Sequence, residues 1–98
     1  MPTVAYSKLL TDPAPAQACG LFIGQHEFAV LLRDGRRLVV PFICFPRLEH
    51  ATAEQLRHFE LYSDGKMLHW PDLDEDIEVQ HLVDGRLPVK AADPLAVA

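Results

Sequence analysis

The sequence predicts a small α+β domain, with a mainly antiparallel sheet of two β-hairpins and two short helices. Two Asp-Gly pairs lie between apolar runs that alternate as strands do, and a short helical pattern follows each hairpin. The 98 residues, 49% hydrophobic and 23% charged, suit one compact core. We expect a loosely held N-terminal segment over residues 1–20, a single α+β domain over residues 21–87 and a C-terminal tail over residues 88–98.

The first predicted hairpin is centred on Asp34-Gly35. A two-residue loop there would place Arg33 opposite Arg36, and like charges that face each other directly are unfavourable. A three-residue loop with a bulge is therefore the alternative. In either register both faces of the ribbon over residues 28–40 are apolar, so each face needs a cover.

A short helix is predicted from residue 52 onward, after the first hairpin. Thr52 and Gln55 have the spacing of a capping box, in which each side chain binds the backbone amide of the other residue. Leu56 and Phe59 form a narrow apolar stripe, so we expect this helix to pack on one face of the sheet.

The second predicted hairpin is centred on Asp64-Gly65 and leads into a second short helix. Pairing across the turn places a core face on one side, and the pairs on it are Leu61 with Leu68 and Phe59 with Trp70. Trp70 is therefore predicted to be buried. After the strand ends at Pro71, residues 76–83 have helical spacing, with Asp76 as the N-cap and Gly85 as the stop.

Two longer motifs, taken with the hairpins, resemble a known family. The first runs Phe45-Pro46-Arg47-Leu48, then His50-Ala51-Thr52 and Glu54-Gln55, and the second runs Leu68-His69-Trp70-Pro71-Asp72-Leu73-Asp74-Glu75-Asp76-Ile77. Over residues 26 to 87 the chain resembles the small bacterial proteins grouped as domain of unknown function 2442. The resemblance implies a small α+β fold without an established catalytic activity. Members are often encoded beside another small protein, in an arrangement similar to a toxin–antitoxin pair.

Charge and composition limit the partners and the compartment. A formal charge of -5 works against direct nucleic-acid binding, because that affinity depends on Lys and Arg at phosphates. We expect no membrane association, since the chain has no run of about 20 apolar residues, and no secretory signal is visible. A cytoplasmic location is the default expectation. Cys19 and Cys44 do not form a C-x-x-C motif.

The strongest binding candidate is the acidic segment, residues 72–76. Its carboxylates would steer a basic partner, and Arg47 is the residue expected to pair with them or to face that partner. The predicted partner-binding residues are Arg47, Asp72, Asp74, Glu75 and Asp76. The D-x-D-x-D opening resembles a calcium loop, but Ile77 and Val83 stand where that loop needs Gly and Glu. We therefore expect a protein-protein interaction module, the antitoxin-like partner of a small basic protein.

An enzyme or a metal- or ligand-binding module is the alternative. A small hydrolase would use Glu60, His69 and a carboxylate of residues 72–76, because Glu60 and His69 are expected to face each other across the second hairpin. The five histidines lack the spacing of a helical zinc site. No catalytic, cofactor-binding or metal-binding residue is assigned from the sequence, and no cofactor is expected.

The first hairpin also predicts a homodimer. Two short helices cannot cover both of its apolar faces, and exposed apolar patches mark interfaces. The alternative cover is residues 3–18 of the same chain, which contain Val4, Tyr6, Leu9 and Leu10.

Overall fold

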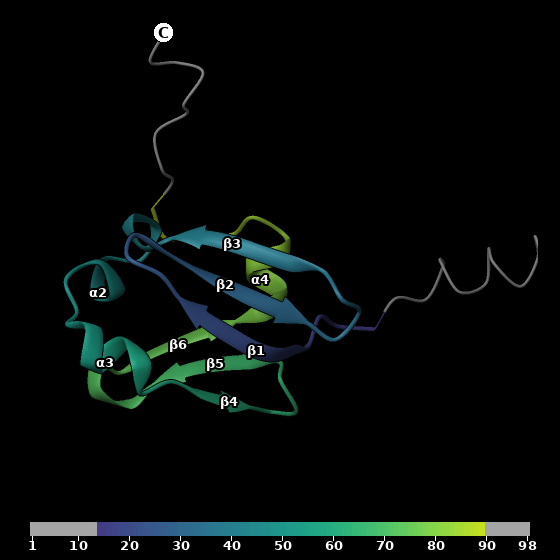
Figure 1. The fold of residues 1–98 in the computed structure, drawn as a ribbon. Helices are drawn as coiled ribbons and strands as arrows, with labels where there is room; N and C mark the ends of the chain where they lie inside the picture. Colours follow the sequence, from purple (N-terminus) through teal and green to yellow (C-terminus); the bar gives the residue numbers. More distant parts are fainter. Residues whose placement is uncertain (1–13, 90–98) are drawn as a thin grey trace, which may run out of the picture.

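The structure is a computed structural model that describes residues 14–89. Two three-stranded antiparallel sheets, ordered β1-β2-β3 and β4-β5-β6, face each other across a shared core (Figure 1). The strands are β1 (Ala18–Ile23), β2 (Glu27–Leu32), β3 (Arg37–Pro41), β4 (Glu60–Tyr62), β5 (Met67–Trp70) and β6 (Glu75–Glu78). The α+β class is confirmed, but each hairpin has gained a third strand and the hairpins lie in separate sheets.

Short helices connect and close the two sheets. Within the described residues they are the α-helices α2 (Pro46–Glu49), α3 (Ala53–Arg57) and α4 (Val79–Val83) and the 3-10 helices η1 (Phe42–Cys44) and η2 (Pro71–Leu73). Helices α2 and α3 lie at one end of the sheets, and α4 contacts β3 and β6 (Figure 1). Of the helices in residues 14–89, none has both the length and the apolar character to cross a bilayer.

The first hairpin adopts the three-residue loop, so the two-residue register is wrong. The Leu32 amide donates to the Arg36 carbonyl at 2.8 Å, and the Gly35 amide donates to the Leu32 carbonyl at 2.9 Å. Gly35 has a φ of 95°, the conformation that such a loop requires. Asp34 accepts hydrogen bonds from the Arg36 amide at 2.9 Å and from Arg36 Nε at 2.7 Å. This arrangement removes the Arg33–Arg36 opposition.

This register decides which apolar side chains of the first sheet are buried. Phe28 pairs with Val40 and Ala29 pairs with Val39, so alternate residues point into the core. The core residues of the two strands are Phe28, Val30, Leu32 and Val40. On the outer face, Phe22, Ala29 and Val39 form one row across the sheet, and Phe22 and Val39 are 52% and 54% exposed.

The second hairpin has the predicted register. Leu61 pairs with Leu68. The φ values of Asp64 and Gly65 are 58° and 83°, and the Lys66 amide donates to the Ser63 carbonyl at 3.2 Å. These values define the expected two-residue turn with positive φ at both central residues.

Helix α3 has the predicted capping box. Thr52 Oγ1 accepts from the Gln55 amide at 3.1 Å, and Gln55 Oε1 accepts from the Thr52 amide at 3.0 Å. Leu56 is the buried residue of this helix. Because five residues cannot form a stable helix alone, the cap and the packing of Leu56 hold α3 in place.

The predicted helix over residues 76–83 is wrong at its start. Glu75–Glu78 is strand β6, in which Ile77 pairs with Leu68, and the helix begins only at Val79. Ile77 and Val79 are buried while Asp76 and Glu78 are exposed, which is the two-residue period of a strand. The helix ends as expected, because Gly85 has a φ of 75°.

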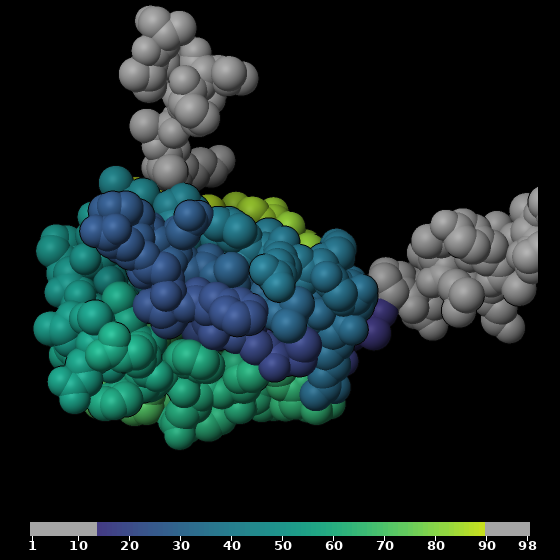
Figure 2. All heavy atoms as spheres, in the orientation of Figure 1, coloured from purple at the N-terminus to yellow at the C-terminus, as the bar shows by residue number. Residues whose placement is uncertain are grey.

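Strand β1 is a second element that the hairpin patterns do not reveal. It begins at Ala18, within the segment 1–20, and residues 1–13 lie outside the described residues. The Ala18 amide donates to the Gly65 carbonyl at 2.6 Å, so β1 is tied to the turn of the second hairpin. A Cβ at Gly65 would collide with the Ala18 carbonyl, so this contact requires glycine. In Figure 2, the purple and blue atoms of β1 and β2 lie above the green atoms of the second hairpin.

Trp70 is buried as predicted and touches both halves of the core. It is 0% exposed, and its ring meets the Phe28 ring edge-on, with the centroids 5.9 Å apart. The indole Nε1 donates to the Leu56 carbonyl at 2.9 Å. Trp70 therefore connects the second sheet, the first sheet and the last turn of α3.

We predict that Trp70→Ala lowers the free energy of unfolding by roughly 3 to 5 kcal/mol, because it leaves a cavity and an unpaired Leu56 carbonyl. Trp70→Phe keeps much of the packing and should cost less. Urea unfolding measures both. Tyr62→Ala, at an aromatic residue that is 47% exposed, is the control. A Trp70→Ala variant that unfolds at the parent's urea concentration would contradict the central position of this side chain.

Candidate functional site

The outer face of the second sheet carries the polar side chains that its inner face excludes. Glu60 pairs with His69, and His69 pairs with Asp76, so these three residues form one row across β4, β5 and β6. Tyr62 and Glu78 flank Met67 in the neighbouring row. We call the surface formed by Glu60, Tyr62, His69, Asp76 and Glu78 the acidic face.

Within the acidic face, His69 binds Asp76 instead of the expected Glu60. His69 Nδ1 lies within hydrogen-bond distance of Asp76 Oδ1. The Tyr62 ring stacks on the His69 ring with the centroids 5.1 Å apart, and the Tyr62 hydroxyl donates to Glu60 Oε1 at 2.8 Å. This hydrogen bond to a carboxylate raises the pKa of Tyr62 above its ordinary value. Glu60 is thus held by Tyr62, so the predicted pairing of its carboxylate with His69 is wrong.

The acidic segment continues this surface around the end of the sheet. Asp72 contacts His58 Nδ1 at 3.0 Å, and Asp74 is exposed with a φ of 50°. Because Asp76 belongs to β6, the segment and the acidic face share this residue. The structure therefore places Asp72, Asp74 and Asp76 beside the polar face of the second sheet.

Arg47 lies against the acidic segment, as the sequence predicts. Its Nη1 donates to the Asp74 carbonyl at 2.5 Å and lies 3.8 Å from Glu75 Oε2. The Arg47 side chain is nevertheless 60% exposed, so part of the guanidinium stays accessible. Arg47 thus connects α2 to the turn before β6, and the same position leaves it available to a partner.

Glu75 differs from the other carboxylates of the acidic segment. Its side chain is only 18% exposed. Desolvation by this partial burial raises the pKa of Glu75, and the nearby Arg47 opposes the shift without cancelling it. Glu75 is therefore a packed carboxylate beneath the surface that Asp72, Asp74 and Asp76 present.

The row Glu60–His69–Asp76 contains the residues of the hydrolase alternative. Three hollows of the described surface are lined by other residues, and none of these three includes Glu60 or His69. In residues 14–89, no three His, Cys, Asp or Glu side chains converge in a way that could hold a metal ion.

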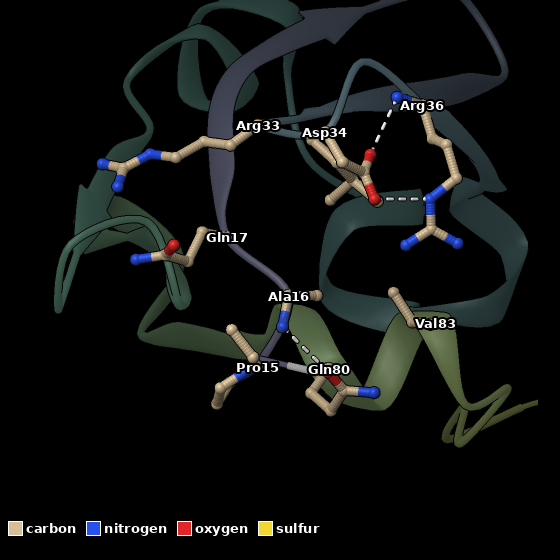
Figure 3. A pocket seen from close by; sticks show the side chains of 10 residues that line it. Pro15, Ala16, Gln17, Arg33, Asp34, Arg36, Gln80 and Val83 are labelled. Atoms are coloured by element: carbon tan, nitrogen blue, oxygen red, sulfur yellow. Dashed lines mark hydrogen bonds and ion pairs between the residues drawn. The ribbon is translucent and has the colours of Figure 1, made fainter. Parts of the chain in front are cut away.

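One of these hollows, of about 440 Å³, lies between residues 14–17, the first hairpin loop and α4 (Figure 3). Its two arginines are already paired: Arg36 with Asp34, and Arg33 with Asp64 at 2.7 Å. The hydrogen bond from the Arg36 backbone amide, with the Arg36 side chain, lowers the pKa of Asp34, and the hydrogen bond from the Arg33 side chain lowers the pKa of Asp64.

Sequence reasoning found part of this surface and missed the rest. It named Arg47 and the carboxylates of residues 72–76, which lie together. It did not include Tyr62, and it counted Glu78 among the acidic residues but assigned it to a helix instead of strand β6. The alternation of Asp76, Ile77, Glu78 and Val79 was the signal that would have placed Glu78 on the outer face of a third strand.

The fold and this surface define a class of small two-sheet α+β proteins with a charged outer face. The model of the family described as "Protein of unknown function (DUF2442)" matches residues 21–88, so the chain belongs to this family. A comparison with curated proteins finds no match.

Two solved structures of unknown or uncharacterised proteins have a similar fold. One, from Rhodospirillum rubrum, has a TM-score of 0.67 and 27% identity, and the match covers 74% of this chain and 89% of that chain. The other, from Chromobacterium violaceum, has a TM-score of 0.64 and 20% identity, with 97% of this chain and 85% of that chain covered. The second likeness supports the fold alone.

We predict that Glu75→Gln stabilises the protein at neutral pH by under ~1 kcal/mol. A carboxyl group whose pKa is raised on folding contributes stability at low pH, and this contribution is lost as the pH rises through the folded pKa. The difference between variant and parent should therefore be small near about pH 4 and larger near about pH 8.

Urea unfolding at the two pH values measures this difference. Glu49→Gln, at an exposed glutamate of α2, removes the same charge and is the control. A Glu75→Gln effect that is independent of pH, or largest at low pH, would contradict the desolvation of Glu75.

Proposed function

We propose that the protein is a protein-protein interaction module that binds a small basic partner through the acidic face and the acidic segment. The observation that carries the proposal is a set of exposed carboxylates on the second sheet and on the segment that leads into β6. Glu60, Asp76 and Glu78 lie on the outer face of the sheet, and Asp72 and Asp74 precede β6. Clustered charge of one sign raises the encounter rate with a partner of opposite sign.

The local contacts support a recognition role for these carboxylates. Asp72 and Asp76 each contact a histidine, and Glu78 contacts His81 Nε2 at 2.9 Å. Contact with a histidine restricts the orientations of each of these carboxylates, so less side-chain entropy is lost when a partner binds them. Asp74 extends from the turn between η2 and β6, beside the accessible part of Arg47. The surface thus combines oriented carboxylates with one guanidinium.

The finer form of the proposal is an antitoxin-like role in the cytoplasm. In this role the acidic side of the protein would neutralise a small basic protein encoded beside it. The formal charge of -5 favours such a partner and disfavours a nucleic acid. The three hollows described above give no support to the hydrolase alternative, because Glu60 and His69 line none of them.

The test is coexpression with the product of the neighbouring gene, followed by copurification and measurement of association rates at two ionic strengths. Asp72→Asn combined with Asp74→Asn should slow association and weaken its salt dependence, because surface charges act mainly on the encounter rate. The fold should remain intact, since both residues are exposed.

The matched control is Glu27→Gln combined with Glu49→Gln, which removes two exposed charges away from the acidic segment. This control should associate nearly as fast as the parent. A neighbouring product that does not copurify contradicts the antitoxin-like role. A complex whose association is unchanged in the Asp72/Asp74 variant at both ionic strengths contradicts steering by the acidic segment.

Self-association through the first sheet is a separate part of the proposal. Phe22, Ala29 and Val39 form an apolar row on its outer face, and Val39 is 54% exposed. A two-fold contact would use this row twice and cover it in both copies.

We predict a dimer in solution that Val39→Asp converts to a monomer, because a charge in the apolar row would lose its hydration on association. Light scattering of the full chain over a range of concentrations measures this change. Ile43→Asp, at a residue of η1 that is 53% exposed and outside the row, is the control. A parent protein that is monomeric at every concentration would contradict the dimer.

A further inference from the structure

Strand β1, at the edge of the first sheet, lies beside the second hairpin. The two segments are hydrogen-bonded at one end, and a groove separates β1 from its neighbours at the other end. At the hydrogen-bonded end, Ala18 of β1 is bound to Gly65. At the other end, β1 and the loop after it lie across a groove from α3 and the start of β4. This groove of about 540 Å³, the seam groove, is lined by residues 21–25, Ala53, Arg57 and Phe59.

Strand β1 presents unpaired backbone groups to this groove. It is the edge of its sheet, and its hydrogen-bonded pairs with β2 alternate with pairs that are not hydrogen-bonded. The Gly24 amide donates to the Glu27 carbonyl at 2.8 Å, so Gly24 and Glu27 form a hydrogen-bonded pair. By alternation along the strand, Ile23 with Phe28 and Leu21 with Val30 are pairs that are not hydrogen-bonded. The amide and carbonyl groups of Leu21 and Ile23 therefore point toward the free edge, where an added strand would bind them.

The groove has apolar side chains in its lining, and the charge it carries is positive. Its lining includes Phe22, which is 52% exposed, and the half-buried Phe59. Arg57 is the charged residue of the lining, and Arg37 lies 5.4 Å from the centre of the Phe22 ring. Among the ion pairs of residues 14–89, none joins Arg57 or Arg37 to a carboxylate.

We propose that the seam groove binds an extended peptide segment of a partner protein as an additional strand on β1. The peptide backbone would bond to Leu21 and Ile23, an apolar side chain would enter the groove, and a neighbouring carboxylate would bind Arg57. Backbone pairing at a free edge supplies affinity in such complexes, while the groove and its charge select the sequence. The occupant is thus an apolar and acidic strand, which distinguishes this surface from the acidic face.

The probe for the test is a blocked peptide of sequence Thr-Val-Asp-Val-Thr, titrated into the full chain and followed by amide NMR. The signals of Leu21 and Ile23 should shift on binding. Arg57→Glu should weaken binding about tenfold, which corresponds to about 1.4 kcal/mol. Arg86→Glu makes the same charge change at an exposed residue outside the groove and should leave binding unchanged.

Two altered peptides complete the experiment. A peptide with lysine in place of aspartate should bind more weakly to the parent and more tightly to the Arg57→Glu variant. A peptide with N-methylated backbone amides should not bind, because it cannot pair with the strand edge.

The proposal is overturned if the aspartate peptide leaves the Leu21 and Ile23 signals unchanged, or if the N-methylated peptide binds equally well. Equal binding of the lysine peptide overturns the role of Arg57. In the Val39→Asp variant, which removes the proposed dimer, shifts of Leu21 and Ile23 that depend on protein concentration alone would show that a second copy of the chain occupies the edge, which also overturns the proposal.

Discussion

The indole of Trp70 joins three parts of the molecule that share no strand ladder. The two sheets are hydrogen-bonded in separate sets, and α3 is too short to be stable alone. Trp70 lies in the second sheet, packs its ring against Phe28 of the first and donates its indole N–H to Leu56 of α3. Burying a large aromatic ring is a major contribution to a small core, and the indole hydrogen bond fixes the ring's orientation. The relative position of the sheets therefore depends on this side chain.

This inward packing also determines the charged surface. Because successive side chains of a strand point to opposite faces, burying Leu68, Trp70 and Ile77 sends His69, Asp76 and Glu78 outward. A register slip by one residue would bury the charges and expose the core. The acidic face is thus a direct consequence of the register that the core selects, and its carboxylates keep their relative positions as long as the second sheet is intact.

The sequence predicts the features that depend on local contacts. The turn at Asp64-Gly65, the cap at Thr52 and the burial of Trp70 follow from neighbouring residues, and all three are confirmed. Strand β1 is missed although it pairs with the adjacent strand β2, because the loop over residues 24–26 carries no Asp-Gly signal. Strand β6 is missed because its residues run into Val79, Leu82 and Val83, whose spacing also fits a helix. For the candidate site, the opposite charges of Arg47 and residues 72–76 predict their contact although Arg47 and Asp74 are 27 residues apart, whereas charge gives no such signal for the Tyr62–Glu60 bond. That bond depends on the observed side-chain orientations on β4.

The acidic face and the seam groove follow from different physical features of the same two-sheet arrangement. The acidic face consists of side chains that point away from the core of the second sheet, so it attracts a partner through their charge. The seam groove lies at an edge where Leu21 and Ile23 leave backbone groups free, so it can bind an extended chain. The Ala18–Gly65 bond keeps the other end of this edge closed, because a strand added there would have to break it. An added strand is thus restricted to the end beside Arg57, where apolar and acidic side chains are favoured together.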